Sequence, residues 1–349
     1  MLENKESRTE LESFGEFALI KHLTKGFENK NKSTGYGIGD DAAVLNSNGK
    51  QVLVSTDLLV ENVHFNLMYS PLKHLGYKSI IVNLSDILAM NGTPEQVTVS
   101  IAVSSRFSVE ALEELYEGIE AACKAYNVDL VGGDTTSSQS GLMISVTAIG
   151  YADSDKIAYR NNAQENDLLF ISGDLGGAYI GLQLLEREKQ VFEAAPTVQP
   201  DLDGHDYALE RQLKPECRAD VIRMLAEVGV VPTSMIDISD GLASEVLHIC
   251  ESSNIGCAIY ENKIPIDPTI VSTCLDFNIA PTVAALNGGE DYELLFTIKQ
   301  ADYAKLENNA LVCAIGHITD KASGVVLNSE SGVVTPITAQ GWDGLASKE

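Results

Sequence analysis

Six short segments of the sequence place carboxylates beside glycine, alanine or hydroxyl-bearing residues. They are GIGDDAAVL (37–45), STDLLVENVHF (55–65), NLSDILAMNGTP (83–94), LVGGDTTSS (130–138), IDISDGL (236–242) and NGGEDYELLFT (287–297). Each acid borders an apolar run, so we expect it where a strand or helix meets a loop. A single Asp beside glycine is most simply a turn former or a helix N-cap. Six such segments in one chain instead favour a shared chemical role.

That role is metal binding. Carboxylates that converge without a counter-charge repel one another, and their pKa values rise. Hard divalent cations relieve this repulsion, and all-oxygen ligands select Mg²⁺, Ca²⁺ or Mn²⁺ over zinc or copper. The calcium-sensor loop is excluded, because its nearest match, Asp153-x-Asp155, continues with Ile157 and lacks the required glycine and terminal Glu. Mg²⁺ usually keeps phosphate oxygens in its shell, so the acids predict a magnesium cluster that binds a nucleotide or phosphorylated substrate.

Other phosphate-binding features are scarce. The chain contains no G-x-x-x-x-G-K-[ST] motif and no kinase H-R-D or D-F-G set, so metals must neutralise most of the phosphate charge. Among the basic residues, we favour Arg160 as a phosphate contact, whereas Lys78 is by default an exposed cation. The segment SGDLGGAYIG (172–181) fits either a phosphate cradle at a helix start or a tight strand-to-helix turn.

The elements that carry these acids form two units. In the first unit, alternating or continuous apolar patterns predict strands at 51–56, 97–103, 128–131 and 142–151, and helices over 72–90 and from Ser108, a plausible N-cap. A polar linker follows at 152–166. In the second unit we expect strands at 168–173, 257–260 and 292–298, helices from Gly177, at 215–228 and from Gly241, a surface insertion at 190–213 and a polar tail. The pattern predicts an α/β protein with mixed sheets and two domains, 1–152 and 153–349.

Composition narrows the class of protein. The 349 residues include 24 Lys and Arg against 50 Asp and Glu, a net charge of −26, which excludes a general binder of nucleic acid or of anionic membranes. No apolar stretch reaches the roughly 18 residues of a membrane span. The opening MLENKESRTELESF lacks the apolar core of a signal peptide, so we expect a cytoplasmic protein. The six cysteines are scattered without a C-x-x-C pair and read as reduced core residues.

In their order and spacing, the six segments resemble those of the thiamine-monophosphate kinases, from about Gly15 to Trp342. These enzymes use ATP to phosphorylate thiamine monophosphate to thiamine diphosphate, and they belong to the superfamily of aminoimidazole ribonucleotide synthetase. The resemblance implies a two-domain fold of that superfamily, with ATP bound between the domains. It also implies a homodimer in which the N-terminal sheets join into a barrel, so that residues 1–152 serve ATP and Mg²⁺ binding and dimerisation.

Carried over position by position, the resemblance implies three sets of site residues. The Mg²⁺ ligands, with two hydroxyl residues among them, would be Asp41, Ser55, Thr56, Asp57, Asp86, Asp134, Asp237 and Asp240. The ATP contacts would be Tyr116, Gly133, Asp134, Arg160 and Ser239. The thiamine monophosphate contacts would be His64, Glu290 and Trp342, although Gly344-Leu345 stand where the family often has His-Phe.

For three of these positions, the residue type alone also allows a structural role. His64 would be a structural histidine, and Tyr116 suits the core nearly as well as an adenine contact. Trp342 could be buried under the tail or stacked on a flat cationic ring.

The implied chemistry needs no side-chain base. A phosphate monoester acceptor is already ionised near neutral pH, so the reaction requires charge neutralisation and in-line positioning, which several Mg²⁺ ions can provide.

Two alternatives stay open: another ATP-using member such as aminoimidazole ribonucleotide synthetase, and a non-catalytic acidic metal-binding protein. A selenophosphate synthetase would be expected to have a cysteine near its N-terminus, but no cysteine precedes Cys123 in this sequence. The hydrogenase-maturation relative would want a C-terminal cysteine, but the chain ends Ser347-Lys348-Glu349.

Overall fold

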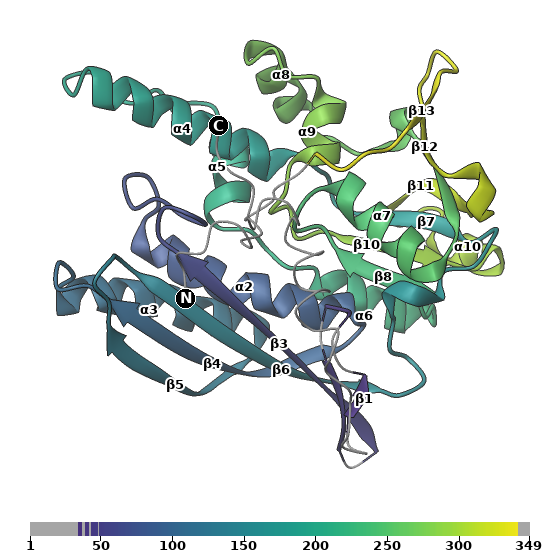
Figure 1. The fold of residues 1–349 in the computed structure, drawn as a ribbon, viewed down its shortest axis with the longest axis horizontal. Helices are drawn as coiled ribbons and strands as arrows, with labels where there is room; N and C mark the ends of the chain where they lie inside the picture. The colour runs from purple at the N-terminus through teal and green to yellow at the C-terminus, as the bar shows by residue number, and fades with distance from the viewer. Residues whose placement is uncertain (1–33, 37–38, 42, 48, 341–349) are drawn as a thin grey trace, which may run out of the picture.

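The computed structural model of the chain describes residues 34–36, 39–41, 43–47 and 49–340. Each half of the chain builds one mixed β-sheet, and helix α2 (Leu72–Ala89) packs between the two halves (Figure 1). Fourteen residues of α2 are buried, on all sides of the helix, which is the pattern of a helix inside a protein. The mixed α/β class predicted from the sequence is confirmed.

The first sheet has six strands. In spatial order they are β1 (Thr34–Tyr36), β2 (Ala43–Ser47), β3 (Lys50–Val60), β6 (Met143–Asp153), β4 (Thr93–Val103) and β5 (Asp129–Ser137). Neighbouring strands are antiparallel except for β4 and β5, which run parallel, and β5 forms one edge of the sheet. The alternation expected near 97–103 is present, because Val97, Val99 and Ile101 are buried.

Helix α3 (Val109–Tyr126) packs against α2 on the same face of this sheet (Figure 1). Its N-cap is Ser108, as the sequence predicted, and the Ser108 hydroxyl accepts a hydrogen bond from the Ala111 N–H. The two helices approach closely at Gly76 and Gly118. A Cβ atom at Gly118 would lie 1.9 Å from the Lys73 carbonyl oxygen, so only glycine allows this contact.

The second sheet has seven strands. In spatial order they are β13 (Val334–Pro336), β12 (Val325–Asn328), β9 (Gly256–Tyr260), β11 (Val312–Thr319), β7 (Leu168–Ser172), β10 (Leu294–Ile298) and β8 (Ser234–Asp237). The helices of this half are α4 (Gly177–Ala194), α5 (Asp206–Leu213), α6 (Ala219–Val228), α7 (Leu242–Ser253), α8 (Pro268–Asp276), α9 (Pro281–Asn287) and α10 (Tyr303–Leu306). Short 3₁₀ turns are η3 (Arg160–Asn162), η4 (Glu261–Lys263), η5 (Gln300–Asp302) and η6 (Lys321–Ser323).

Two expectations for this half were wrong. The segment expected to be a polar tail contains β11, which lies in the middle of the second sheet. The segment 190–213, expected to be a surface insertion, ends in helix α5, which buries Ala208 and Gln212. A small residue and an amide carry little apolar signal, so the hydrophobic pattern could not reveal this burial.

Two further features concern the whole described chain. All six cysteines are free, and five of them are buried. Among the described residues, no single helix has the length and apolar character needed to cross a membrane, although the bent pair α8 and α9 reaches both criteria jointly.

Candidate active site

A cavity of about 1470 Å³ opens between the two halves of the chain. Five of the six acidic segments contribute to its lining, and the segment LVGGDTTSS (130–138) does not. The acids along the wall are Asp40, Asp41, Asp57, Asp86, Glu186, Asp237, Asp240, Glu251 and Glu290. The fold therefore concentrates on one surface the acids that the sequence spreads over most of the chain.

Three aspartates form the centre of this site. Asp41, Asp86 and Asp237 each offer a carboxylate oxygen, and these oxygens lie within 4.8 Å of one another. Asp41 precedes β2, Asp86 lies in the last turn of α2, and Asp237 ends β8. Neighbouring hydroxyls fix two of the carboxylates: Ser55 Oγ donates to Asp86 and Ser85 Oγ donates to Asp237, both at 2.5 Å.

Arg160 places a guanidinium group against these acids. Its Nε lies 3.3 Å from an oxygen of Asp40 and 3.3 Å from an oxygen of Asp41, and its Nη2 also contacts Asp41. The backbone N–H of Arg160 donates to Asp40 at 3.0 Å. Its carbonyl oxygen accepts a hydrogen bond from Ser253 of α7 at 2.9 Å. The cation is thus held by both its backbone and its side chain.

One guanidinium does not neutralise the whole cluster. Burial raises the pKa of Asp237 to about 7, and the charge of Asp41 adds to the rise. Burial also raises the pKa of Asp86, followed by the charge of Asp57. The pKa of Asp40 rises to about 7 for the same two reasons, burial and then the charge of Asp41. The site therefore favours a further positive charge.

The donor set fits a hard divalent cation such as Mg²⁺. Among the described residues, the group whose ligand atoms lie within 4.8 Å of one another consists of three aspartates, with hydroxyl residues beside them and no His nitrogen or Cys sulfur in the group. A further buried acid, Glu245 in the first turn of α7, accepts a hydrogen bond from the Asp240 N–H at 3.0 Å. Its other carboxylate oxygen has no hydrogen-bond partner among the described residues. These groups suit a site that holds cations.

This electrostatic arrangement predicts how stability depends on pH. Asp40, Asp86 and Asp237 bind protons more tightly in the folded than in the unfolded chain, because their folded pKa values lie above the usual Asp value. Their contribution to the free energy of unfolding is complete below about pH 4, the unfolded pKa. For Asp40 and Asp237 it is lost as the pH rises through about 7, and for Asp86 it is lost as the pH rises through its raised folded pKa.

We therefore expect Mg²⁺ to raise the melting temperature more at about pH 8 than at about pH 6, since the metal binds the deprotonated carboxylates. Thermal unfolding in EDTA and in Mg²⁺ at both pH values measures the effect. An equal shift at both pH values would mean that these carboxylates do not receive the metal.

The other expected metal ligands flank the three central aspartates. Ser55, Thr56 and Asp57 follow one another on β3, and all three line the cavity. Thr56 donates to the Val146 carbonyl oxygen at 2.9 Å. Asp240, with Ser239, occupies the turn between β8 and α7.

The expected ATP contacts divide into two groups. Arg160 and Ser239 line the cavity, whereas Tyr116, Gly133 and Asp134 do not. Gly133 and Asp134 are exposed on the edge strand β5. Tyr116 borders a separate cavity of about 420 Å³ between α3 and the start of β5. Within one chain, β6 and β4 separate β5 from the acids of β3.

Two of the three expected contacts for thiamine monophosphate lie in the main cavity. His64 is oriented by its Nδ1, which accepts a hydrogen bond from the Val60 N–H at 3.0 Å. Glu290 adopts a left-handed backbone conformation with φ +65°, and its carboxylate accepts a hydrogen bond from Gln212 Nε2 at 2.8 Å. Trp342 lies outside the described residues.

Lys78 corrects one expectation. It is not an exposed cation: only 5% of it is exposed, and its Nζ lies 3.0 Å from Glu290 and 2.9 Å from the Gln212 carbonyl oxygen. The sequence offered no signal for this role, because a lysine in a helical apolar pattern is usually solvated. The positive charge of Lys78 fixes Glu290 at the wall of the cavity.

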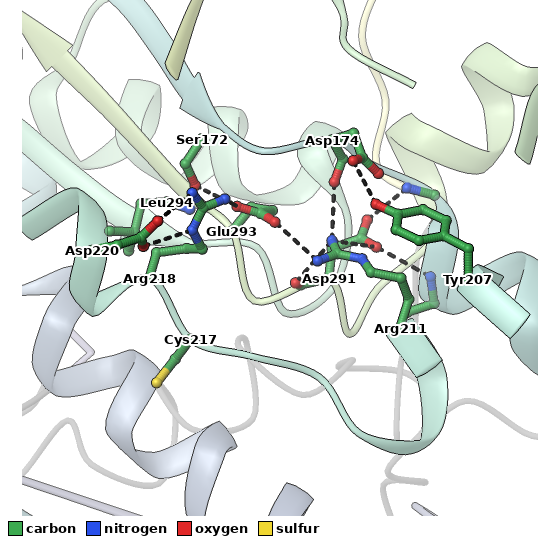
Figure 2. A network of polar contacts seen from close by, with 12 residues as sticks. Ser172, Asp174, Tyr207, Arg211, Cys217, Arg218, Asp220, Asp291, Glu293 and Leu294 are labelled. Atoms are coloured by element: carbon green, nitrogen blue, oxygen red, sulfur yellow. Dashed lines mark hydrogen bonds and ion pairs between the residues drawn. The ribbon is translucent and has the colours of Figure 1, made fainter. Parts of the chain in front are cut away.

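A buried network of polar contacts surrounds Asp291 and Glu293, which follow Glu290 in the chain (Figure 2). Arg211 of α5 donates to Glu293 at 3.0 Å and to the Asp291 carbonyl oxygen at 3.2 Å. Arg218 contacts the other oxygen of Glu293 at 2.6 Å, and Ser172 donates to that same oxygen at 2.5 Å. Sequence reasoning singled out the segment 287–297 but assigned only Glu290. Arg211 lay in the segment misread as a surface insertion.

Comparison with known proteins agrees with this geometry. Residues 39–152 match the family described as AIR synthase related protein, N-terminal domain. The chain is 34% identical to the thiamine-monophosphate kinase of Bacillus subtilis over 318 residues, which cover 89% of this chain and 94% of that protein. It is 33% identical to the thiamine-monophosphate kinase of Aquifex aeolicus over 287 residues, covering 82% and 87% of the two chains.

A solved structure described as "AaThiL complexed with AMPPCP and TMP" superposes with a TM-score of 0.82 at 31% identity. It covers 97% of this chain, and this chain covers 99% of it. These similarities and the two mixed sheets place the chain among the enzymes of the aminoimidazole ribonucleotide synthetase-like fold. Within that class, the chain belongs to the thiamine-monophosphate kinase family.

Proposed function

We propose that this chain transfers the γ-phosphoryl group of ATP directly to the phosphate of thiamine monophosphate, giving thiamine diphosphate and ADP. The observation that carries the proposal is the convergence of Asp41, Asp86 and Asp237 in a cavity large enough for two substrates. The similar structure that bound AMPPCP and TMP supports the choice of substrates.

Several Mg²⁺ ions are part of this proposal. Asp41, Asp86 and Asp237 would hold them at the centre, Ser55, Thr56 and Asp57 on the side of β3, and Asp240 on the side of α7. Bound Mg²⁺ supplies charge neutralisation between the two anionic substrates. The side chains of the cluster fix where that charge is applied, because hydroxyl donors and the helix and strand ends already set their positions.

Two sets of residues in the cavity would hold the two substrates. Arg160 and Ser239 lie beside α7, where a guanidinium and a turn can hold the phosphates of ATP. His64 and Glu290, the latter paired with Lys78, would hold thiamine monophosphate. The Glu290 N–H donates to the Ser239 carbonyl oxygen at 2.7 Å, so the two sets of contacts meet at this loop. No general base is required, because the acceptor oxygen is ionised near neutral pH. What these residues contribute is in-line positioning.

A homodimer is also part of the proposal. β5 is an edge strand with all nine residues exposed, including Leu130 at 44% and Val131 at 56%. Successive strands lie about 4.8 Å apart, so β5 lies roughly 14 Å from β3 in the same sheet. We therefore propose that Asp134 and Gly133 of one chain bind a metal ion and ATP in the cavity of a second copy of the chain. The assignment of residues 1–152 to ATP binding and dimerisation, and a cytoplasmic location, stay predictions.

The shared site predicts complementation between two inactive variants. Asp57→Asn and Asp134→Asn should each lose turnover, and refolding them together should restore part of it, because a mixed dimer contains one site with both aspartates intact. The measurement is thiamine diphosphate formation by the mixture and by each variant alone. A mixture as inactive as its components would place Asp57 and Asp134 in the same site of one chain.

The acceptor tests the proposed reaction. Thiamine monophosphate should be phosphorylated in the presence of Mg-ATP, whereas thiamine should react far more slowly, because its hydroxyl is not ionised near neutral pH and no base is positioned to deprotonate it. Chromatography of the products compares the two acceptors. Equal rates with thiamine would contradict the base-free reaction. If neither acceptor were phosphorylated, the proposed function would be contradicted.

A further inference from the structure

Helix α4 forms a wall of the cavity that no role above explains. Tyr179, Leu182, Glu186 and Lys189 line the cavity, at spacings of three, four and three residues that place them on one stripe of the helix. Residues on the other side of α4, such as Ile180 and Leu184, are buried in a small apolar core. A polar stripe at a cavity wall, backed by apolar packing, is suited to contact a ligand.

The stripe carries one carboxylate, and residues from both halves of the chain hold it. Tyr69, in the loop between β3 and α2, donates its hydroxyl hydrogen to Glu186 Oε1 at 2.6 Å. Lys189, one turn further along α4, lies 3.3 Å from Glu186 Oε2. The Glu186 side chain is 36% exposed and the Lys189 side chain 21% exposed. The carboxylate is therefore fixed in place and remains accessible from the cavity.

Tyr69 also lies within electrostatic range of Glu290. Its pKa is raised, first by burial, then by the hydrogen bond and charge of Glu186, and further by the charge of Glu290. Tyr69 therefore contacts Glu186 on α4, and Glu290, on the loop after α9, lines the same cavity. A flat cation bound beside Tyr69 would meet an aromatic side chain and the Glu186 carboxylate, in a cavity that Glu290 also lines.

The fold fixes the spacing of the two carboxylates. Asp291, next to Glu290, is fully buried and accepts hydrogen bonds from the N–H groups of Gly176 at 2.7 Å and Ala178 at 3.2 Å. Both N–H groups belong to the start of α4. The two hydrogen bonds therefore connect the loop that contains Glu290 to the helix that carries Glu186. Arg211 reinforces the tie through Asp291 and the Asp174 carbonyl oxygen (Figure 2).

From this arrangement we infer that Glu186, held by Tyr69 on the α4 wall, is a specificity residue that binds the cationic heterocyclic part of thiamine monophosphate. The inference rests on the proposed function and extends its substrate site from His64 and Glu290 to α4. In the absence of substrate, Lys189 supplies the positive charge that faces Glu186. When the substrate binds, its ring cation takes over that contact, while its phosphate points to the aspartates.

The test is Glu186→Gln in the full chain. Glutamine has the same shape and still accepts the Tyr69 hydrogen bond, so it removes only the charge. We expect the KM for thiamine monophosphate to rise about fivefold to tenfold, as befits loss of one charge-assisted contact in a partly exposed site. The kcat and the KM for ATP should stay unchanged. Glu193→Gln, an exposed position of the same helix, is the matched control and should change none of these values.

A second substrate separates recognition of charge from support of structure. In the analogue of thiamine monophosphate whose thiazolium ring is replaced by neutral thiophene, the ring carries no charge. Wild-type protein should prefer the natural substrate, and Glu186→Gln should lose most of that preference. An equal rise of KM for both substrates, or a rise of the KM for ATP, would assign Glu186 to structure and overturn the inference.

The failure of the inference can be told apart from that of the function. Unchanged kinetics in Glu186→Gln, with normal wild-type turnover, would overturn the α4 site alone. If the wild-type chain formed no thiamine diphosphate, the proposed function would fail, and calorimetric binding of thiamine monophosphate to both proteins would still measure the α4 site. Equal binding to both proteins would overturn the inference in that case also.

Discussion

Asp86→Asn should reduce turnover by about a thousandfold or more, which corresponds to roughly 4 kcal/mol of lost transition-state stabilisation. Asp86 lies at the centre of the cluster, where its pKa is raised by burial and then by the charges of Asp57, Asp237 and Asp41. An amide offers no negative charge to Mg²⁺, so the anionic substrates would face each other with one cation held weakly or lost. The measurement is kcat at saturating Mg-ATP and thiamine monophosphate.

The same substitution should stabilise the chain when metal is absent. Asparagine removes one of several mutually repelling carboxylates, so urea unfolding in EDTA should show a higher free energy of unfolding for Asp86→Asn than for wild type near neutral pH. The combination of lost activity and gained stability distinguishes a metal site from a structural acid. Asp155→Asn, an exposed acid outside the cavity, should change neither quantity. Full activity of Asp86→Asn at low Mg²⁺ would contradict the metal cluster.

Arg211→Met should destabilise the chain by about 3 to 5 kcal/mol, the cost of leaving buried carboxylates without their partner. Arg211 is 13% exposed in its side chain and contacts Glu293, Asp291 and the Asp174 carbonyl oxygen (Figure 2). Methionine keeps the apolar stem but removes every donor. Burial already raises the pKa of Asp291 to about 6 despite the opposing charge of Arg211, so removal of that charge raises it further.

The effect should extend to the substrate site. Arg211 precedes Gln212, which donates to Glu290, so the KM for thiamine monophosphate should rise more than the KM for ATP. Urea unfolding and steady-state kinetics measure the two effects. Arg187→Met is the control, because the ion pair of Arg187 with Glu188 is 43% exposed on the arginine side and should contribute at most about 1 kcal/mol. Similar losses in both variants would show that burial of the network does not matter.

The acids that line the cavity could be singled out from the sequence, because each belongs to a short segment in which carboxylates stand beside glycine, alanine or hydroxyl-bearing residues. Asp41, Asp86, Asp237 and Asp240 lie where a strand or helix begins or ends, and such positions are ones that a fold can bring to one cavity. Asp57 differs from this expectation, because it lies within β3. The hydrophobic periods also placed β4, β6 and α3 closely, because each of these elements buries one face in a regular pattern. Helix α2 was found from its long apolar run, since it is buried on all sides.

The supporting residues were not predictable, because their burial depends on long-range pairing. Lys78, Arg211 and Glu293 are charged residues that usually face solvent, and only the contact between α2, α5 and the segment after α9 buries them. Tyr69 and Glu186 meet across the two halves of the chain, 117 positions apart. No local pattern marks such a pair. The placement of Asp134 on an edge strand likewise follows from the order of strands, which periodicity does not reveal.

The central claim is that the clustered aspartates support direct phosphoryl transfer to thiamine monophosphate, and one measurement tests it most directly. The chain is incubated with thiamine monophosphate and ATP labelled at the γ-phosphorus, at a series of Mg²⁺ concentrations and in EDTA. The account predicts that the label appears in thiamine diphosphate, that the rate rises with Mg²⁺, and that EDTA abolishes it. Label released only as inorganic phosphate, or transfer that persists in EDTA, would contradict the account.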